Sequence, residues 1–324
     1  MMTDPFVHLH VASGYSLQYG ASAPQLLVER AAEHGMDTLA LTDRDGTYGA
    51  VRFAKACLQN GVRPVLGVDL AMAPTGTVPG PWANPSDREP RTPVRGGAFR
   101  DRRLPRVTFL AASRAGWAAV CRLVSATHLT GERGDPVCTL DLVAEHAAGR
   151  DVLVLLGPPS ELGAATTLRR EDLAQAVVRR WQEVFDPVDL LVEVVNHRLP
   201  GRGPGSAGHA ARMAGVARAT RTGAVLSNAV RYADRADAVV VDVLDAARRL
   251  VPLDSRHVDR GNAEGFLKSG KEMAEVAEEV SRLAGLGARA ARELLSHTRT
   301  VADRCAVDPR ATSGWGRCTS RSWP

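Results

Sequence analysis

Two histidines near the start of the chain are the first residues whose type and spacing could support chemistry. His8 and His10 stand two residues apart in the apolar run 7–11, and on a strand this spacing places both imidazoles on one face. A metal centre needs at least a third ligand of suitable type. The other motifs supply none nearby, so a packed or hydrogen-bonded role is the preferred interpretation of both histidines.

Other candidates for chemistry are weaker. His197 follows an apolar run and precedes the glycine-rich stretch 201–205, so a ligand role and a turn role both explain it. That stretch lacks the GxxxxGK[ST] pattern, and Pro204 removes an amide that a phosphate cradle would need. Ser13 and Ser16 lie near His10, but no GxSxG motif and no base with an orienting acid accompanies them. Nucleophilic catalysis is therefore not indicated.

Short apolar runs alternate with longer segments of helical period, and they would position these residues. The predicted strands are 7–11, 38–41, 64–72, 106–111, 152–156, 190–195 and 224–226. The predicted helices are 24–34, 48–59, 113–129, 140–147, 171–184, 207–221 and 233–249. Strands that alternate with helices indicate the α/β class, with a parallel sheet closed or nearly closed into a barrel. In such barrels the loops at the carboxyl ends of the strands build the site.

Several segments fall outside this alternation. Residues 73–105 are dense in Pro, Gly and Arg and are expected to form a disordered surface insertion, with DNA contact by the arginines a less favoured alternative. Beyond residue 249 we expect an irregular connection at 251–266, an exposed helix at 271–283 and a further helix at 288–305. The barrel would then occupy residues 1–249 and a helical extension residues 250–310.

Composition excludes some classes of protein. The net charge is +5 and the pI is near 9.2, with Lys55, Lys268 and Lys271 the only lysines, so contact with phosphate backbones is permitted but weakly supported. The five cysteines form no CxxC pair, which argues against a zinc knuckle and a disulfide framework. No apolar run is long enough to span a membrane and no signal peptide is recognisable, so a cytoplasmic location is expected.

Ordered motifs connect the chain to a known family. Between residues 6 and 279 the chain carries, in this order, the runs FVHLHVASGYSLQYGA, LALTDRDGTYGAVRFAKAC, GVRPVLGVDLAM, RVTFLAAS, DVLVLLG, DLLVEVVNHRLPG, VLSNAVRYADRADA and RGNAEGFLKSGKEMAEVAEE. They resemble the N-terminal PHP (polymerase and histidinol phosphatase) domain of bacterial DNA polymerase III alpha subunits, and the resemblance covers roughly residues 6–309. The resemblance implies a PHP-type distorted (β/α)7 barrel with a C-terminal helical extension.

The resemblance also implies a metal site. Family PHP domains bind up to three metal ions through His, Asp, Glu and Cys side chains, and the active members hydrolyse phosphoesters with a metal-activated water. In this chain His10 matches the first histidine of the family's HxH motif, whereas Ala12 replaces the second and Tyr19 replaces the following aspartate. The family's Thr-Asp-His reads Thr, Asp43, Arg44, and Asp69 takes the place of a glutamate.

The later motifs depart further from the family pattern. Arg106 replaces a histidine, and Pro158 replaces a cysteine. The family's Asn-Asp-Val-His-Tyr carries Ala229 and Arg231 at its two ligand positions. Only His10 and Asp69 are counted as surviving ligands. A guanidinium cannot bind a metal ion and repels it.

We therefore expect a vestigial pocket with no catalytic residue, no metal and no cofactor. Its surviving acids, such as Asp43 and Asp69, would pair with Arg44 or Arg231. In the family, Mg²⁺ serves the polymerase and divalent metals serve the active PHP relatives.

The end of the chain reads unlike the rest. Residues 311–324, ATSGWGRCTSRSWP, favour neither helix nor strand, and with assumed GC-rich codons another reading frame yields a peptide similar to the family's entry into the polymerase palm. The prediction is an aberrant tail that follows a frame change, in a chain truncated before the palm. Such a chain would not synthesise DNA by itself.

The resemblance implies a role in DNA replication or translesion synthesis. The preferred hypothesis is a structural barrel that offers surfaces to DNA or to other replication and repair proteins. The alternative is a free-standing metal-dependent phosphoesterase of the PHP superfamily, and a basic nucleic-acid-binding module is a third, compatible interpretation. The sequence leaves the parent open between a replicative and an error-prone polymerase. Ligand loss and the insertion favour the error-prone kind.

Overall fold

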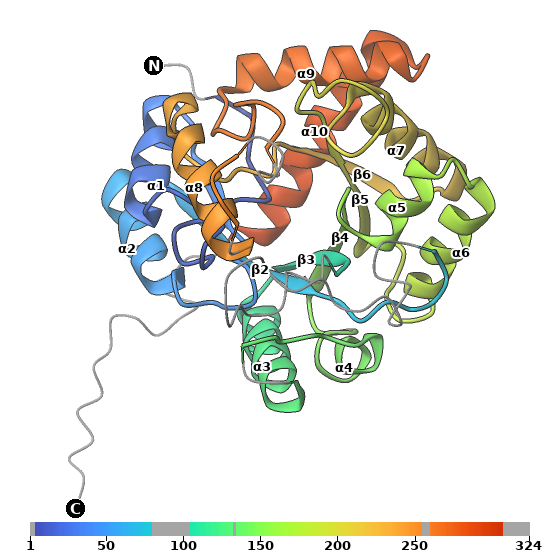
Figure 1. Ribbon diagram of the computed structural model, residues 1–324, viewed down its shortest axis with the longest axis horizontal. Helices are drawn as coiled ribbons and strands as arrows, with labels where there is room; N and C mark the ends of the chain where they lie inside the picture. Colours follow the sequence, from blue (N-terminus) through green and yellow to red (C-terminus); the bar gives the residue numbers. More distant parts are fainter. Residues whose placement is uncertain (1–3, 80–103, 132–133, 250, 255–259, 307–324) are drawn as a thin grey trace, which may run out of the picture.

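The computed structural model describes residues 4–79, 104–131, 134–249, 251–254 and 260–306. Within them, six strands form one curled sheet in sequence order (Figure 1). The strands are β1 (Thr38–Leu41), β2 (Arg63–Ala71), β3 (Arg106–Ala111), β4 (Val152–Leu156), β5 (Leu190–Val195) and β6 (Gly223–Ser227). β1 and β2 pair in parallel, as do β4, β5 and β6, while β3 runs antiparallel to both of its neighbours. The prediction of an all-parallel sheet is wrong at β3.

The segment 7–11 lies between the two ends of this sheet without forming a regular strand. On one side the carbonyl of His8 accepts from the Ala40 amide of β1 at 3.0 Å. On the other, the carbonyl of His10 accepts from the Val230 amide, just beyond β6, at 2.9 Å. The predicted seventh strand is thus an irregular extended segment. Its hydrogen bonds on both sides nevertheless connect the ends of the sheet into a distorted barrel.

Helices cover the outside of the curled sheet (Figure 1). They are α1 (Pro24–Glu33), α2 (Ala50–Asn60), α3 (Arg114–Thr130), α4 (Leu140–His146), α5 (Glu161–Thr167), α6 (Glu171–Gln182), α7 (Ala207–Thr220), the 3-10 turn η1 (Arg235–Asp237), α8 (Ala238–Arg249), α9 (Gly270–Leu283) and α10 (Gly287–Cys305). Pro24 opens α1 at a position where its missing amide costs no hydrogen bond. Short α5 was not predicted, and its Ser160 cap accepts from the Gly163 amide.

The two C-terminal helices pack into the barrel core. α9 buries Met273, Val276, Ala277 and Val280 in the main apolar cluster, so the prediction of an exposed helix at 271–283 is wrong. Its apolar positions recur at helical spacing, which gives the helix one face for burial. From α10, Val301, Ala302 and Cys305 join a second cluster with inward-facing strand residues. Both helices therefore share the apolar core of the sheet.

Two predicted segments lie largely outside the described residues. Of the insertion 73–105 only the ends are described, and Val78 there is buried. The tail 311–324 lies entirely outside. Among the helices of the described residues, none combines the length and apolar character that crossing a membrane requires.

Candidate functional site

The loops at one edge of the sheet bring the predicted pocket residues together. Asp43 and Arg44 follow β1, and Asp69 lies near the end of β2. Arg106 begins β3, and because β3 is antiparallel its first residue pairs with Ala71 at the end of β2. The antiparallel strand thus delivers an arginine to the edge where the parallel strands deliver carboxylates.

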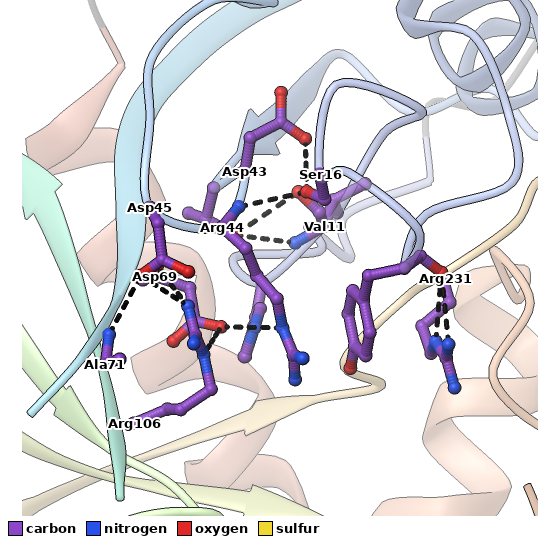
Figure 2. Close-up of polar contacts among 12 residues, drawn as sticks. Val11, Ser16, Asp43, Arg44, Asp45, Asp69, Ala71, Arg106 and Arg231 are labelled. Carbon is purple, nitrogen blue, oxygen red and sulfur yellow. Dashed lines mark hydrogen bonds and ion pairs between the residues drawn. The ribbon is translucent and has the colours of Figure 1, made fainter. Parts of the chain in front are cut away.

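Asp69 is the centre of the charged network. Its side chain is 2% exposed, and its Oδ2 accepts from Arg106 Nε at 2.8 Å and lies 3.3 Å from Arg44 Nε (Figure 2). Burial raises the pKa of Asp69, but the adjacent guanidinium groups of Arg106 and Arg44 outweigh it and hold the pKa below its usual value. Asp69 is therefore a buried, ionised carboxylate between two arginines.

Arg106 donates to three acceptors through its Nε and Nη2. Its Nη2 donates to Asp45 Oδ1 at 3.0 Å and to the Asp69 carbonyl at 2.8 Å. Asp45 Oδ1 also accepts from the Ala71 amide at 3.0 Å (Figure 2). Burial lowers the pKa of Arg106, but Asp69 and Asp45 raise it above its usual value. The guanidinium stays charged where the family has a metal-binding histidine.

Asp43 does not take part in this network. It accepts from the Ser13 amide at 2.7 Å and from the hydroxyls of Ser13 and Ser16 at 2.9 and 2.7 Å. Burial raises its pKa, and these hydrogen bonds offset the rise only in part. The expected pairing with an arginine is wrong for Asp43 and correct for Asp69. Ser13 and Ser16 bind this carboxylate, which accounts for their position beside the pocket.

His10 forms an ion pair that the sequence did not reveal. Its Nδ1 lies 2.8 Å from Oε1 of Glu193 on β5, and both side chains are buried. Burial lowers the pKa of His10, but the Glu193 carboxylate outweighs it and raises the pKa to about 9. A protonated imidazole has no free lone pair for a metal. Gly157 makes room for Glu193, because a Cβ there would overlap its carboxylate.

Three arginine side chains gather around the ring of Tyr19. The Cζ atoms of Arg44, Arg231 and Arg248 lie 3.2, 3.9 and 5.6 Å from its ring centroid. Arg231 donates to both oxygens of Asp245 on α8, at 2.7 and 3.2 Å, and to the Tyr19 carbonyl. Arg231 therefore binds Asp245, and the expected partners Asp43 and Asp69 lie elsewhere.

The remaining predicted positions supply no ligand. Ala12 is buried and apolar. Ala229 adopts a positive φ of 41°, a conformation that costs about 1–2 kcal/mol for a residue with a Cβ. Pro158 follows β4, as its place in the family pattern predicts.

Of the other two conspicuous histidines, His8 is buried and His197 is half-buried, and both are neutral. His8 Nε2 donates to the Lys268 carbonyl at 2.8 Å and His197 Nε2 donates to the Asn228 carbonyl at 2.7 Å. Burial lowers the pKa of each to about 4. His8 is packed and hydrogen-bonded as predicted. His197 is held in a hydrogen bond to the turn after β6.

Sequence reasoning missed Glu193 and the partners Asp45, Asp245 and Arg248. One signal was available for Glu193, because a charged residue inside the apolar run 190–195 must be buried with a partner. Another was the i, i+3 spacing of Asp245 and Arg248, which hydrogen-bond at 3.0 Å on α8. Neither signal identifies which residue from elsewhere in the sequence pairs with Glu193 or with Asp245.

The side chains that line the pocket do not form a set of ligands that fits a metal ion. In the described part of the chain, no three His, Cys, Asp or Glu side chains gather closely enough to hold one. The surviving ligand types are already engaged, since His10 is protonated beside Glu193 and Asp69 lies between two guanidinium groups.

The fold and the pocket define a distorted α/β barrel whose strand-end site is occupied by internal ion pairs. The sequence pattern of the PHP domain matches residues 8–197, more than half of the chain, and the chain belongs to this family. It is 31% identical over 294 residues to the error-prone DNA polymerase of Mycobacterium bovis, covering 88% of this chain and 25% of the relative. It is 28% identical over 309 residues to the DNA polymerase III subunit alpha of Treponema pallidum, covering 93% and 23%.

The chain thus spans about a quarter of the length of these curated relatives. Among solved structures it is similar to an amidohydrolase from Chromobacterium violaceum, with 15% identity and a TM-score of 0.42 over 69% of this chain and 87% of that one.

Proposed function

We propose that this chain is the PHP domain of a DNA polymerase III alpha-type chain of the error-prone kind, with a barrel that has a structural role and no phosphoesterase activity. The parent would act in DNA replication or translesion synthesis in the cytoplasm, with Mg²⁺ serving its polymerase site. DNA and other replication or repair proteins would be the partners of the barrel surface. Similarity to two polymerase relatives over most of the chain supports the parent class.

The observation that carries the metal-free role is the arrangement around Asp69. Two guanidinium groups, of Arg106 and Arg44, lie 2.8 and 3.3 Å from one of its oxygens. A divalent cation at this carboxylate would face two fixed positive charges at close range, where the local dielectric screens them weakly. Binding a cation would require these arginines to leave their buried partners, which makes occupancy unfavourable.

Metal analysis together with an activity assay tests the proposal. Protein purified without chelator is examined by elemental mass spectrometry, and hydrolysis of p-nitrophenyl phosphate is followed with Mn²⁺ or Zn²⁺. We expect sub-stoichiometric metal and no turnover above a buffer blank. Stoichiometric metal with turnover abolished by His10→Ala, but not by His146→Ala on α4, would instead establish the alternative, a metal-dependent phosphoesterase.

Binding to DNA is a separate arm of the proposal. A basic surface predicts affinity that falls steeply as salt increases, because cations are released from the phosphate backbone. Fluorescence anisotropy with a labelled duplex at two salt concentrations measures this slope. Absence of binding at low salt would remove DNA from the partners and leave protein surfaces as the contacts of the barrel.

A further inference from the structure

Arg212 on α7 is held by two backbone carbonyls on the outside of the barrel. Its Nε donates to the Thr166 carbonyl near the end of α5 at 3.3 Å, and its Nη2 donates to the Arg202 carbonyl in the loop before α7 at 2.6 Å. Nη1 makes no hydrogen bond within the residues that the structure describes, and Arg212 is half-buried. The guanidinium is therefore fixed in place and retains a donor for a group from outside.

The same two carbonyls bring Arg169 and Arg202 beside Arg212. The Thr166 carbonyl also accepts from the Arg169 amide at 3.2 Å, so the backbone of Arg169 and the side chain of Arg212 meet at one oxygen. Burial lowers the pKa of Arg212, and the positive charges of Arg169 and Arg202 lower it further. The three guanidinium groups are thus close enough to interact. Arg169, Arg202 and Arg212 together are named the basic cluster.

Hydrogen bonds fix the two segments that carry the basic cluster. His209 on α7 is buried, and its Nε2 donates to the Gly163 carbonyl of α5 at 3.0 Å, which joins these neighbouring helices (Figure 1). In the loop before α7, the Gly203 carbonyl accepts from the Ser206 amide at 3.1 Å and from the Ser206 hydroxyl at 2.7 Å. Arg202 is therefore displayed by a loop that its own hydrogen bonds close.

No carboxylate neutralises the basic cluster. Within the described ranges, none of its three guanidinium groups forms an ion pair with Asp or Glu, and Asp172, three residues beyond Arg169, binds Arg170 at 2.6 Å instead. Elsewhere in the chain an exposed arginine such as Arg198 has a carboxylate partner, with its Nε 3.0 Å from Glu279 Oε2. Uncompensated like charges repel one another and attract anions. The binding of a polyanion would relieve this repulsion.

From the three uncompensated guanidinium groups on α5, α7 and the loop between β5 and α7, we propose that the basic cluster binds the phosphate backbone of DNA. Guanidinium groups form strong paired hydrogen bonds with phosphate oxygens, and interfaces with DNA are more positively charged than interfaces between proteins. The centre of a protein interface is depleted of charge and rich in apolar side chains. Leu168 is the one large apolar side chain that is exposed in the fully described ranges 161–169 and 198–212, so the surface fits DNA better.

This inference rests on the DNA contact of the proposed function and deepens it, because it names the surface that makes the contact. The basic cluster takes no part in the hydrogen bonds and ion pairs of Asp69. DNA binding at the cluster therefore does not depend on whether the strand-end pocket holds a metal ion.

The experiment is fluorescence anisotropy of the full chain with a labelled DNA duplex, titrated with salt in buffer that contains chelator. Each phosphate contact adds about 0.9 to the steepness of log affinity against log salt. In the double variant Arg169→Gln/Arg202→Gln we expect this slope to be shallower by about 1.8. Between about 50 and 200 mM salt, its affinity should then fall roughly twelvefold less than that of the wild type.

The matched control removes two positive charges from the opposite side of the barrel. Arg52 and Lys55 are exposed on α2, which lies across the barrel from α5 and α7 (Figure 1). Arg52→Gln/Lys55→Gln should therefore keep the slope of the wild type. Equal reductions of the slope in the two double variants would show general attraction by net charge and would overturn the inference.

Arg212→Gln removes the third charge together with two hydrogen bonds to carbonyls. Its slope should be shallower by about 0.9, and Arg212→Lys, which keeps the charge, should restore most of it. If Arg212→Gln fails to fold, the two exposed arginines of the double variant still decide the question.

The remaining outcomes separate this inference from the proposed function. An unchanged slope in Arg169→Gln/Arg202→Gln, with DNA still bound, would overturn the inference alone. Absence of DNA binding by the wild type at low salt would overturn the inference together with the DNA contact of the proposed function. Tighter binding of poly-glutamate than of the duplex would assign the basic cluster to an acidic protein and overturn DNA as its partner.

Discussion

His10 Nδ1 lies 2.8 Å from Glu193 Oε1, and this buried pair joins the first segment of the barrel to β5 across 183 positions of sequence. His10 is the one histidine of the family's first motif that this chain retains, and its imidazole is engaged in this pair. It also supplies the charge that holds His10 protonated. His10 is therefore engaged by Glu193 although its residue type matches the family pattern.

Glu193→Gln should reveal the strength of this pair. Removing one partner of a buried ion pair leaves an uncompensated charge and typically costs about 3–5 kcal/mol. We expect the free energy of unfolding, measured by urea denaturation at pH 6, to fall by about 3 kcal/mol. Glu161→Gln is the control, because Glu161 is also buried but accepts hydrogen bonds from Thr75.

The pH dependence of the same variant provides a sharper check. The pKa of His10 is raised from 6.5 to about 9, so its stabilising contribution is complete below about pH 6.5 and is lost as the pH rises through 9. The difference in unfolding free energy between wild type and Glu193→Gln should therefore shrink from pH 6 to pH 9.5. A difference that stays constant over this range would contradict the assignment.

The pair of Asp69 and Arg106 should show strong coupling in a double-mutant cycle. Asp69→Asn and Arg106→Gln each leave a buried charge without its main partner, whereas the double variant removes both charges. We expect a coupling energy of about 1–3 kcal/mol from denaturation of the four proteins. The exposed pair Arg289 and Glu293 on α10 is the control, with about 0.5 kcal/mol or less. Additive effects at Asp69 and Arg106 would exclude a direct pair.

His197→Gln should make the protein less sensitive to acid. Burial lowers the pKa of His197 from 6.5 to about 4, so the stability it contributes is present above pH 6.5 and is lost as the pH falls through 4. Glutamine offers an amide donor to the Asn228 carbonyl and does not titrate. Between pH 6.5 and 5, the variant should lose about 2 kcal/mol less unfolding free energy than the wild type. Identical losses of unfolding free energy in the two proteins would show that a group other than His197 causes the acid sensitivity.

Gly67→Ala should destabilise the sheet where β2 meets β3. A Cβ at Gly67 would overlap the Phe109 carbonyl oxygen and lie 2.9 Å from Leu110 Cδ2. Such overpacking costs about 1–3 kcal/mol and should lower the thermal midpoint. Gly215→Ala, at an exposed position of α7 with nothing within 4 Å of its Cβ, should instead raise stability by about 0.5–1 kcal/mol. Opposite signs for the two glycines distinguish crowding from a general effect of alanine.

Local pattern predicted most of the elements. The apolar runs at β1, β3, β4 and β5 coincide with the observed strands, because buried strands carry apolar side chains on both faces. The pattern failed at 7–11, where an apolar run forms hydrogen bonds on both sides but no regular ladder. It also said nothing of the direction of β3. Strand direction depends on where the chain returns to the sheet, which the local composition of a run does not encode.

The family motifs indicated where the pocket lies, but not which of its charged residues pair with one another. Asp69, Arg44 and Arg106 lie near one another, since Arg44 follows β1, Asp69 lies near the end of β2 and Arg106 begins β3, all at the same edge. Asp43 was assigned an arginine partner, yet the adjacent turn supplies Ser13 and Ser16 instead. Carboxylates bind the nearest donors, and the nearest donors here come from the loop that closes over Asp43.

What the sequence by itself determined is the order of strands and helices, the membership in the PHP family and the replacement of histidines by Arg44, Arg106 and Arg231. What only the tertiary structure decided is which charges meet, such as His10 with Glu193 and Arg231 with Asp245. The physical reason is that an ion pair depends on a separation of a few ångströms between segments far apart in the chain. That separation exists only after the barrel has closed.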